Sequence, residues 1–113
     1  MIERISSHVL NTTLGTPAPG VPGTLERLDT GGRWVSVGAG TTDADGRIGR
    51  LNTAAVAAGD FRLTLDTADY FLATVGTVFY PSIVLMFRLD GERAHYHIPV
   101  LASTYSYSTY LGS

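Results

Sequence analysis

Short runs of alternating apolar and polar residues, separated by turn residues at intervals of about ten, most constrain how this chain folds. Ile5 to Asn11, Phe61 to Leu65 and His95 to Leu101 have a period of two, which is the period of a β-strand. Ser82 to Leu89 is almost continuously apolar and predicts a further strand. Because Pro99 cannot donate to a hydrogen-bond ladder, its strand is expected near a sheet edge or distorted there. The whole pattern predicts an all-β sandwich.

Turn-forming residues divide the chain between these strands. The Gly- and Pro-rich residues 15–23 predict a connection between two sheets, and Asp29-Thr30-Gly31-Gly32 predicts a hairpin. Trp34, just after that turn, is expected in the core. Residues 67–73 are the only segment that favours a helix, of two turns at most, with Thr67 as its N-cap.

Length and composition fit one domain and exclude several kinds of chemistry. A chain of 113 residues, 44% of them hydrophobic, can bury one core, so residues 1–113 are expected to form a single domain. The absence of cysteine excludes thiolate nucleophiles and cysteine-ligated metals, and the absence of lysine excludes Schiff bases. Scattered arginines and a net charge of -2 argue against nucleic-acid and anionic-membrane partners. No apolar run has the length of a signal peptide or membrane span, so we expect a cytoplasmic protein.

His95-Tyr96-His97 is the segment best able to carry chemistry. On a strand, its two histidines share a face and lie roughly 6 to 7 Å apart, which suits a metal pair or a general base with an orienting partner. His8, on another strand, could complete a three-histidine site if the two strands were neighbours. The same spacing also fits two half-exposed polar residues on a solvated face.

Arg47 and the tyrosine-rich tail are further candidates. Arg47 follows the Asp45-Gly46 turn, and its permanently charged guanidinium can bind an anion or an oxyanion. A solvent-facing turn residue fits the same pattern. The tail, residues 103–113, predicts a last strand whose tyrosines fit packing on a sheet surface.

Motifs spread along nearly the whole chain resemble the 5-hydroxyisourate hydrolase family, the transthyretin-related enzymes of urate breakdown. The most specific are His-Tyr-His-Ile-Pro at residues 95–99 and Tyr-Ser-Thr-Tyr at residues 107–110. The others, in chain order, are Ser-His-Val-Leu-Asn at 7–11, Gly15 with Pro17-Ala18, Thr-Asp-Ala-Asp-Gly-Arg-Ile at 42–48, Asp66-Thr67, Tyr70-Phe71 and Phe79-Tyr80-Pro81.

The resemblance implies a fold, an assembly and an activity. The fold is a transthyretin-like (prealbumin-like) sandwich of two sheets and about eight strands with one short helix. The assembly is a homotetramer, a dimer of dimers, with active sites in the channel between dimers. The activity is hydrolysis of 5-hydroxyisourate, an oxidised purine, to 2-oxo-4-hydroxy-4-carboxy-5-ureidoimidazoline, without a cofactor or metal. The family's catalytic positions match His8, Arg47 and His97 here, and transthyretins, the hormone carriers, differ at them.

The mechanism expected from this resemblance is acid–base catalysis by imidazole. Histidine takes and returns a proton near neutral pH, so we expect His97 and His8 to orient and deprotonate water. Arg47 is expected to stabilise charge on the attacked carbonyl. Ser113 is expected to contact ring heteroatoms through its hydroxyl or a terminal carboxylate.

The substrate-binding residues that the resemblance implies are Tyr110, Leu111, Gly112 and Ser113. The family tail is Tyr-Arg-Gly-Ser, so here an apolar leucine replaces a bidentate cationic donor. One interpretation is a slow or redirected hydrolase that acts on another cyclic amide or related ring. In another, arginines such as Arg33 or Arg50 compensate. A transthyretin-like binder without turnover is a further hypothesis.

Overall fold

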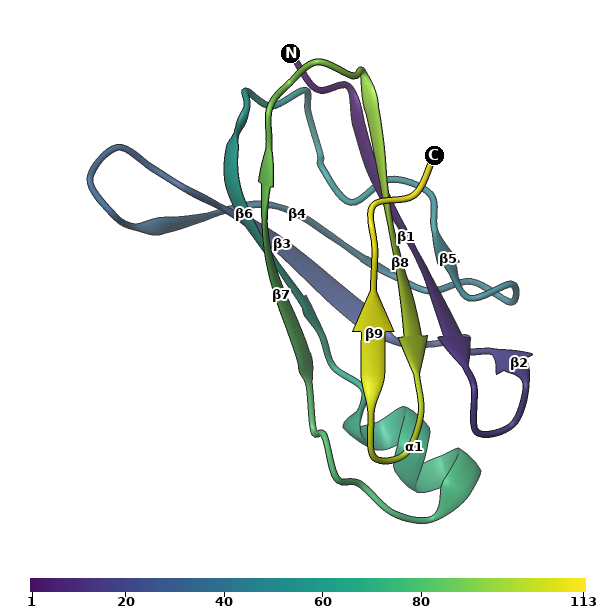
Figure 1. The fold of residues 1–113 in the computed structure, drawn as a ribbon. Helices are drawn as coiled ribbons and strands as arrows, with labels where there is room; N and C mark the ends of the chain where they lie inside the picture. Colours follow the sequence, from purple (N-terminus) through teal and green to yellow (C-terminus); the bar gives the residue numbers. More distant parts are fainter.

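Two β-sheets pack face to face, and one short helix lies at an end of the sandwich (Figure 1). The computed structural model describes residues 1–113. The first sheet has the strand order β2–β1–β8–β9, with β5 also paired to β1, and the second has the order β4–β3–β6–β7. The strands are β1 (Arg4–Asn11), β2 (Thr16–Pro17), β3 (Pro22–Leu28), β4 (Trp34–Thr41), β5 (Arg47–Ile48), β6 (Gly59–Leu65), β7 (Ile83–Leu89), β8 (His95–Ala102) and β9 (Tyr107–Thr109). The predicted two-sheet, all-β architecture is therefore confirmed.

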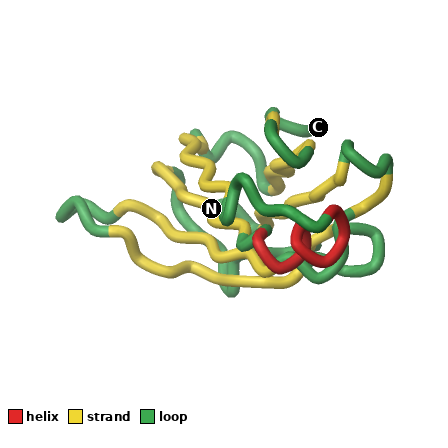
Figure 2. Tube along the Cα trace, turned by 90° about the horizontal axis from the view of Figure 1, so that it is seen from below, coloured by secondary structure: helices red, strands yellow, loops and turns green.

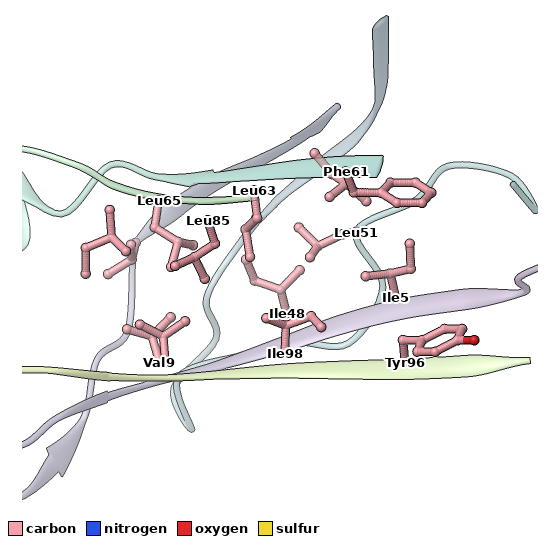
Figure 3. Close-up of a cluster of buried hydrophobic side chains, with 14 of the residues drawn as sticks. Ile5, Val9, Ile48, Leu51, Phe61, Leu63, Leu65, Leu85, Tyr96 and Ile98 are labelled. Atoms are coloured by element: carbon pink, nitrogen blue, oxygen red, sulfur yellow. The ribbon is translucent and has the colours of Figure 1, made fainter. Parts of the chain in front are cut away.

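The core lies between the two sheets and is built from the residues that alternate inward. Ile5 and Val9 of β1 point toward the second sheet, as do Tyr96 and Ile98 of β8 (Figure 3). All four are buried, and burying one large aliphatic side chain contributes about 1.5–3 kcal/mol. Because successive strand residues point to opposite faces, the alternate residues of β1 and β8 lie on the outer face of the first sheet.

β1 and β8 run parallel and pair in register from Arg4 with His95 to Asn11 with Ala102. The other strand pairs of both sheets are antiparallel. A parallel pair needs a long crossover connection, and here most of the chain lies between the two strands. The N-terminal strand and the strand that carries two histidines are therefore neighbours, although they are distant in sequence.

Pro99 lies on a strand with neighbours on both sides, because β8 is placed between β1 and β9. The carbonyl of Pro99 accepts a hydrogen bond from Thr109 Oγ1 at 2.8 Å, which directs its backbone polar groups to the β9 side. The β8–β9 ladder ends with Val100 opposite Thr109. The missing N–H of proline therefore removes no ladder bond. The expectation of a strand near a sheet edge is confirmed: β8 lies next to the edge strand β9, and Pro99 is tolerated because β9 is short.

Helix α1 (Ala68–Val75) confirms the predicted short helix and lies at one end of the sandwich, as Figure 2 shows from below. Gly76 ends the helix with a φ of 79°, a left-handed conformation that glycine adopts without a steric cost. Thr67 is its N-cap residue, but the threonine side chain does not cap the helix. Its Oγ1 donates to the carbonyl of Tyr80 at 3.0 Å instead. With eight residues, this helix is too short to cross a membrane.

The β3–β4 hairpin forms at the predicted turn and projects from the sandwich (Figure 1). The Asp29 carboxylate stabilises the turn by accepting the N–H groups of Gly31 and Arg33 at 2.8 and 2.9 Å. The prediction of Trp34 as a core residue is wrong. Its side chain is half-buried, and the guanidinium of Arg62 lies 4.5 Å from the ring centroid. Because the hairpin projects outward, the indole packs under a surface arginine and not between the sheets.

Candidate active site

Two neighbouring strands place a row of polar side chains on the outer face of the first sheet. The parallel register of β1 and β8 sets Arg4 opposite His95 and Ser6 opposite His97. His8 follows on the same face of β1. The alternation predicted from the sequence is therefore present on both strands. The ring centroids of His95 and His97 are 6.3 Å apart, within the predicted spacing.

A tight turn brings Arg47 to the same face. β5 pairs antiparallel with β1 and sets Arg47 opposite His8. In the turn before it, Asp43 Oδ1 accepts the backbone N–H groups of Asp45 and Arg47, each at 2.9 Å. Gly46 has a φ of 78°, and a Cβ there would lie 2.4 Å from the carbonyl oxygen of Val9. Glycine is therefore required for the turn to pack against β1.

The polar side chains of this row other than His8, together with Arg47, line a small polar cavity of about 240 Å³. Its lining comprises Arg4, Ser6, Ser7, Arg47, Ile48, Gly49, His95, His97 and Ser113. No aspartate or glutamate side chain lines it, and the two ion pairs of the chain, Arg62–Glu26 and Arg88–Asp60, involve neither of its arginines. Two unpaired guanidinium groups favour a ligand with negative or carbonyl oxygens.

Ser6 connects the two histidines of β8. Its hydroxyl oxygen lies 2.7 Å from His95 Nε2 and 2.7 Å from His97 Nδ1. Arg4 Nη2 lies 3.1 Å from His95 Nδ1, the other ring nitrogen of that histidine. The outer face of β1 and β8 therefore carries a continuous hydrogen-bond chain that ends at His97.

Burial and positive neighbours keep the histidines of β8 neutral near pH 7. The pKa of His97 is lowered, first by burial and then by the charges of Arg47, His95, His8 and Arg4. The pKa of His95 is also lowered, by burial and then by Arg4. A lowered histidine pKa means that protonation requires a more acidic solution than usual. Both rings are therefore available as uncharged hydrogen-bonding groups.

His8 lies at the margin of the cavity. Its Nε2 is 2.8 Å from the carbonyl oxygen of Asp45, and because a carbonyl only accepts, Nε2 is the protonated nitrogen. In the uncharged ring, Nδ1 is then the nitrogen that can accept a hydrogen. A three-histidine metal site is not formed, because no group of three or more His, Asp or Glu side chains gathers in the way a metal ion requires.

Two hydrogen bonds, one to a residue that lines the cavity, hold Gly112 of the C-terminal tail in place. The N–H of Gly112 donates to the carbonyl of His97 at 2.8 Å. Arg93 Nη1 donates to the carbonyl of Gly112 at 3.1 Å, and the Arg93 guanidinium carbon lies 5.6 Å from the ring centroid of Tyr96. These contacts place Ser113 in the lining of the cavity.

Tyr110 and Leu111 lie outside this cavity. Both line a larger apolar groove of about 640 Å³ between β7 and the end of β9. Leu111 is 53% exposed. Within one chain, the four tail residues therefore lie beside two different cavities. Gly112 and Ser113 lie beside the polar cavity, and Tyr110 and Leu111 lie beside the groove. Within one chain, neither Arg33 nor Arg50 lines the cavity.

The structure adds Arg4, Ser6 and Arg93 to the residues identified from the sequence. Arg4 and Ser6 share a strand face with His8, and that alternation was the one available signal for them. Their role depends on the parallel pairing with β8, which nothing in the sequence specifies. Arg93 lies just before β8, and no pattern in the sequence indicated a role for it.

Replacing Gly112 with alanine should detach the tail. A Cβ at this position would lie 2.9 Å from His97 Cδ2 and 3.0 Å from the carbonyl oxygen of His97, so the tail must shift. Overpacking costs about 1–3 kcal/mol, which lowers the equilibrium constant for docking of the tail roughly 5- to 150-fold. The measurement is the rate at which a carboxypeptidase releases Ser113. Gly49→Ala is the control, because a Cβ at Gly49 meets no atom within 4 Å. Equal release from both variants would contradict the docked tail.

Comparison with known proteins places the fold in a family. A family profile described as HIUase/Transthyretin family matches residues 5–112. The chain belongs to this family. A relative from Salmonella typhimurium named 5-hydroxyisourate hydrolase is 42% identical over 110 residues, which make up 96% of this chain and 80% of the relative. The family resemblance stated from the motifs is therefore confirmed.

Solved structures similar to this chain include a 5-hydroxyisourate hydrolase and a transthyretin. The Klebsiella pneumoniae 5-hydroxyisourate hydrolase superimposes with a TM-score of 0.84 at 30% identity, covering 98% of this chain and 99% of that one. Transthyretin from Sparus aurata superimposes with a TM-score of 0.88 at 30% identity, covering 96% of each chain. Since both fit the backbone about equally well, the fold does not separate these two kinds of protein, and the side chains of the site must do so.

Proposed function

We propose that this chain hydrolyses 5-hydroxyisourate to 2-oxo-4-hydroxy-4-carboxy-5-ureidoimidazoline in urate breakdown, with the polar cavity as its active site. The observation that carries the proposal is the convergence of Arg47, His97 and Ser113 on one cavity, with His8 opposite Arg47. Relatives named 5-hydroxyisourate hydrolase, at 34–42% identity over most of the chain, support it. The size of the cavity, about 240 Å³, suits a small flat ring.

Hydrolysis of a cyclic amide needs three things from the protein. A base must take a proton from water, a donor must stabilise the oxyanion that forms on the attacked carbonyl, and a proton must return to the leaving nitrogen. The guanidinium of Arg47 makes no hydrogen bond or ion pair within the chain, so it is free to stabilise the oxyanion. The imidazoles of His97, which lines the cavity, and of His8, which lies opposite Arg47, can take and return the proton. No metal or cofactor enters these steps.

Leu111→Arg tests whether the leucine weakens the site. Because Leu111 lines the apolar groove and not the polar cavity, an arginine there stays outside the cavity of its own chain. We expect hydrolysis of 5-hydroxyisourate to change by no more than about twofold to threefold, the range of a change near 0.5 kcal/mol, when the two proteins are compared in the same assembly state as measured by sedimentation. Steady-state kinetics of the two proteins side by side measure this. A gain well above tenfold would instead identify the natural chain as an impaired hydrolase or one redirected to another cyclic amide.

We further propose that the chain assembles as a homotetramer, a dimer of dimers. β7 and β9 end their sheets and leave unpaired backbone edges on either side of the apolar groove. Apolar side chains are exposed there, among them Met86 at 72%, Val84 at 47% and Tyr110 at 58%. An unpaired, apolar edge is a template for pairing with another copy.

Sedimentation equilibrium at micromolar concentration measures the assembly. The expected mass is that of four chains. Met86→Glu should shift the distribution toward smaller species, because it places a charge on the exposed β7 edge. Leu72→Glu is the matched control, since Leu72 is 59% exposed on the helix and away from both edges. A monomer at that concentration would contradict the assembly.

A further inference from the structure

Donor and acceptor rules favour one direction for the hydrogen bonds that lead to His97. A guanidinium only donates, so Arg4 Nη2 donates to His95 Nδ1, and that nitrogen carries no proton. A neutral His95 then carries its proton on Nε2, which donates to Ser6 Oγ. If Ser6 Oγ also accepted from His97 Nδ1, the hydroxyl hydrogen of Ser6 would have no partner within the chain, so the favoured arrangement has Ser6 donate to His97 Nδ1. His97 Nδ1 is therefore an acceptor, and its proton is on Nε2.

The remaining nitrogen of His97 is open to a ligand. Nε2 has no partner within the chain, and no buried side-chain nitrogen or oxygen in the structure lacks a partner. His97 Nε2 therefore contacts solvent, and His97 lines the polar cavity. A small molecule in the cavity would meet an N–H donor at this position.

We propose that Arg4 is a positioning residue that directs this chain and so makes His97 a hydrogen-bond donor, leaving the removal of a proton from water to His8. The inference rests on the proposed function of the cavity. His97 Nε2–H and Arg47 bind the carbonyl oxygen that is attacked. His8 Nδ1, whose ring donates through Nε2 to the carbonyl of Asp45, takes the proton from water. Hydroxide adds to the carbonyl carbon, the ring C–N bond breaks, and His8 returns the proton to the nitrogen.

The opposite assignment is disfavoured by the same geometry. For His97 to act as the base, its proton must sit on Nδ1 and donate to Ser6. The Ser6 hydroxyl then either donates to His95 Nε2 or has no partner within the chain. In the first case His95 is protonated on Nδ1, which faces the donor group of Arg4 at 3.1 Å. In both cases a hydrogen bond of the present arrangement is lost. Arg4 thus ties the tautomer of one histidine to that of the next.

The charges around His97 also favour its neutral form. From β1 it faces Arg4 and His8, from β5 Arg47, from its own strand His95, and from the tail Ser113. Burial lowers the pKa of His97 most, and the four basic neighbours lower it further. A cationic His97 would need a proton on both ring nitrogens, and the proton on Nδ1 would oppose the hydroxyl hydrogen of Ser6. Neutral His97 with its proton on Nε2 is the form that fits every neighbour.

Nitrogen-15 NMR of the histidine side chains tests the inference on the intact protein. The two neutral tautomers give different shifts for Nδ1 and Nε2, and the chain has only three histidines to assign. The variants are Arg4→Met, which removes the donor, Arg4→Gln, whose amide can donate or accept, and Arg4→Lys, which can only donate. Arg33→Met, in the β3–β4 turn outside the cavity, is the matched control.

We expect the wild type, Arg4→Lys and Arg33→Met to hold His97 with its proton on Nε2. Arg4→Met and Arg4→Gln should populate the Nδ1-protonated tautomer. If the fraction of molecules with the His97 proton on Nε2 falls to between a half and a tenth, kcat for 5-hydroxyisourate should fall about 2- to 10-fold. Arg4→Lys should keep kcat near the wild-type value. An unchanged His97 tautomer in both Arg4→Met and Arg4→Gln would overturn the inference. Because the NMR arm needs no substrate, a failure of the proposed function is distinguishable from a failure of the positioning role.

Discussion

Arg47→Ala should lower kcat/KM for 5-hydroxyisourate at least about 100-fold, the low end for removing one oxyanion donor. The reason is geometric. β5 sets Arg47 opposite His8, and the guanidinium of Arg47 reaches the polar cavity without an ion-pair partner. An alanine at this position leaves the turn intact, because the contacts that form the turn are made by its backbone N–H. Folding and assembly should therefore be unchanged.

The control for this variant is Arg33→Ala, which removes the same charge from a turn outside the cavity. Wild-type kinetics are expected for it. Circular dichroism and sedimentation of both variants would show that the fold and the assembly are retained. A loss of less than threefold for Arg47→Ala would end the assignment of Arg47 to the reaction.

His97→Asn should cost a similar factor, at least about 100-fold in kcat/KM. The asparagine side chain ends near the position of His97 Nδ1, where it can still meet Ser6, but it has no group at Nε2. His97→Gln is the informative companion, because its longer amide can place an N–H near that position. If His97 is a donor, the glutamine variant should retain at least about tenfold more activity than the asparagine variant, a difference near 1.4 kcal/mol.

Equal activities of the glutamine and asparagine variants, both far below the wild type, would identify His97 as a base and not a donor. Activity close to wild type in both would remove His97 from the reaction.

His8→Gln tests the residue proposed as the base. An amide cannot take a proton from water near neutral pH, so this variant should lose activity by about 100-fold or more, the range for a general base.

Local patterns predicted much of this fold, and non-local pairing accounts for most of what they missed. Alternation correctly separated the inward residues of β8 from His95 and His97, because side-chain direction on a strand is a local property. Trp34 was misjudged because its surroundings come from a distant residue, Arg62. Thr67 is the N-cap residue as predicted, but its side chain bonds to the carbonyl of the distant Tyr80 and does not cap the helix. Apolar character and capping preference describe a residue alone, whereas its final contacts depend on what the fold places beside it.

The candidate site shows the same division. The sequence pointed to His8, Arg47 and His97, and the structure places the last two in one cavity with the first at its margin. Arg4 and Ser6 acquire their roles only from a parallel pairing with β8 across 91 positions of the chain. The direction of their hydrogen bonds needs coordinates and a rule about which groups can donate. The spacing of residues in the sequence does not give this direction.

The decay of freshly generated 5-hydroxyisourate, followed by ultraviolet absorbance with and without the protein, tests the central claim most directly. The wild type should accelerate the decay well beyond the spontaneous rate in buffer, and Arg47→Ala at the same concentration should return it close to that rate. A wild-type trace that overlays the buffer trace, from a protein shown to be folded and assembled, would contradict hydrolysis by this cavity.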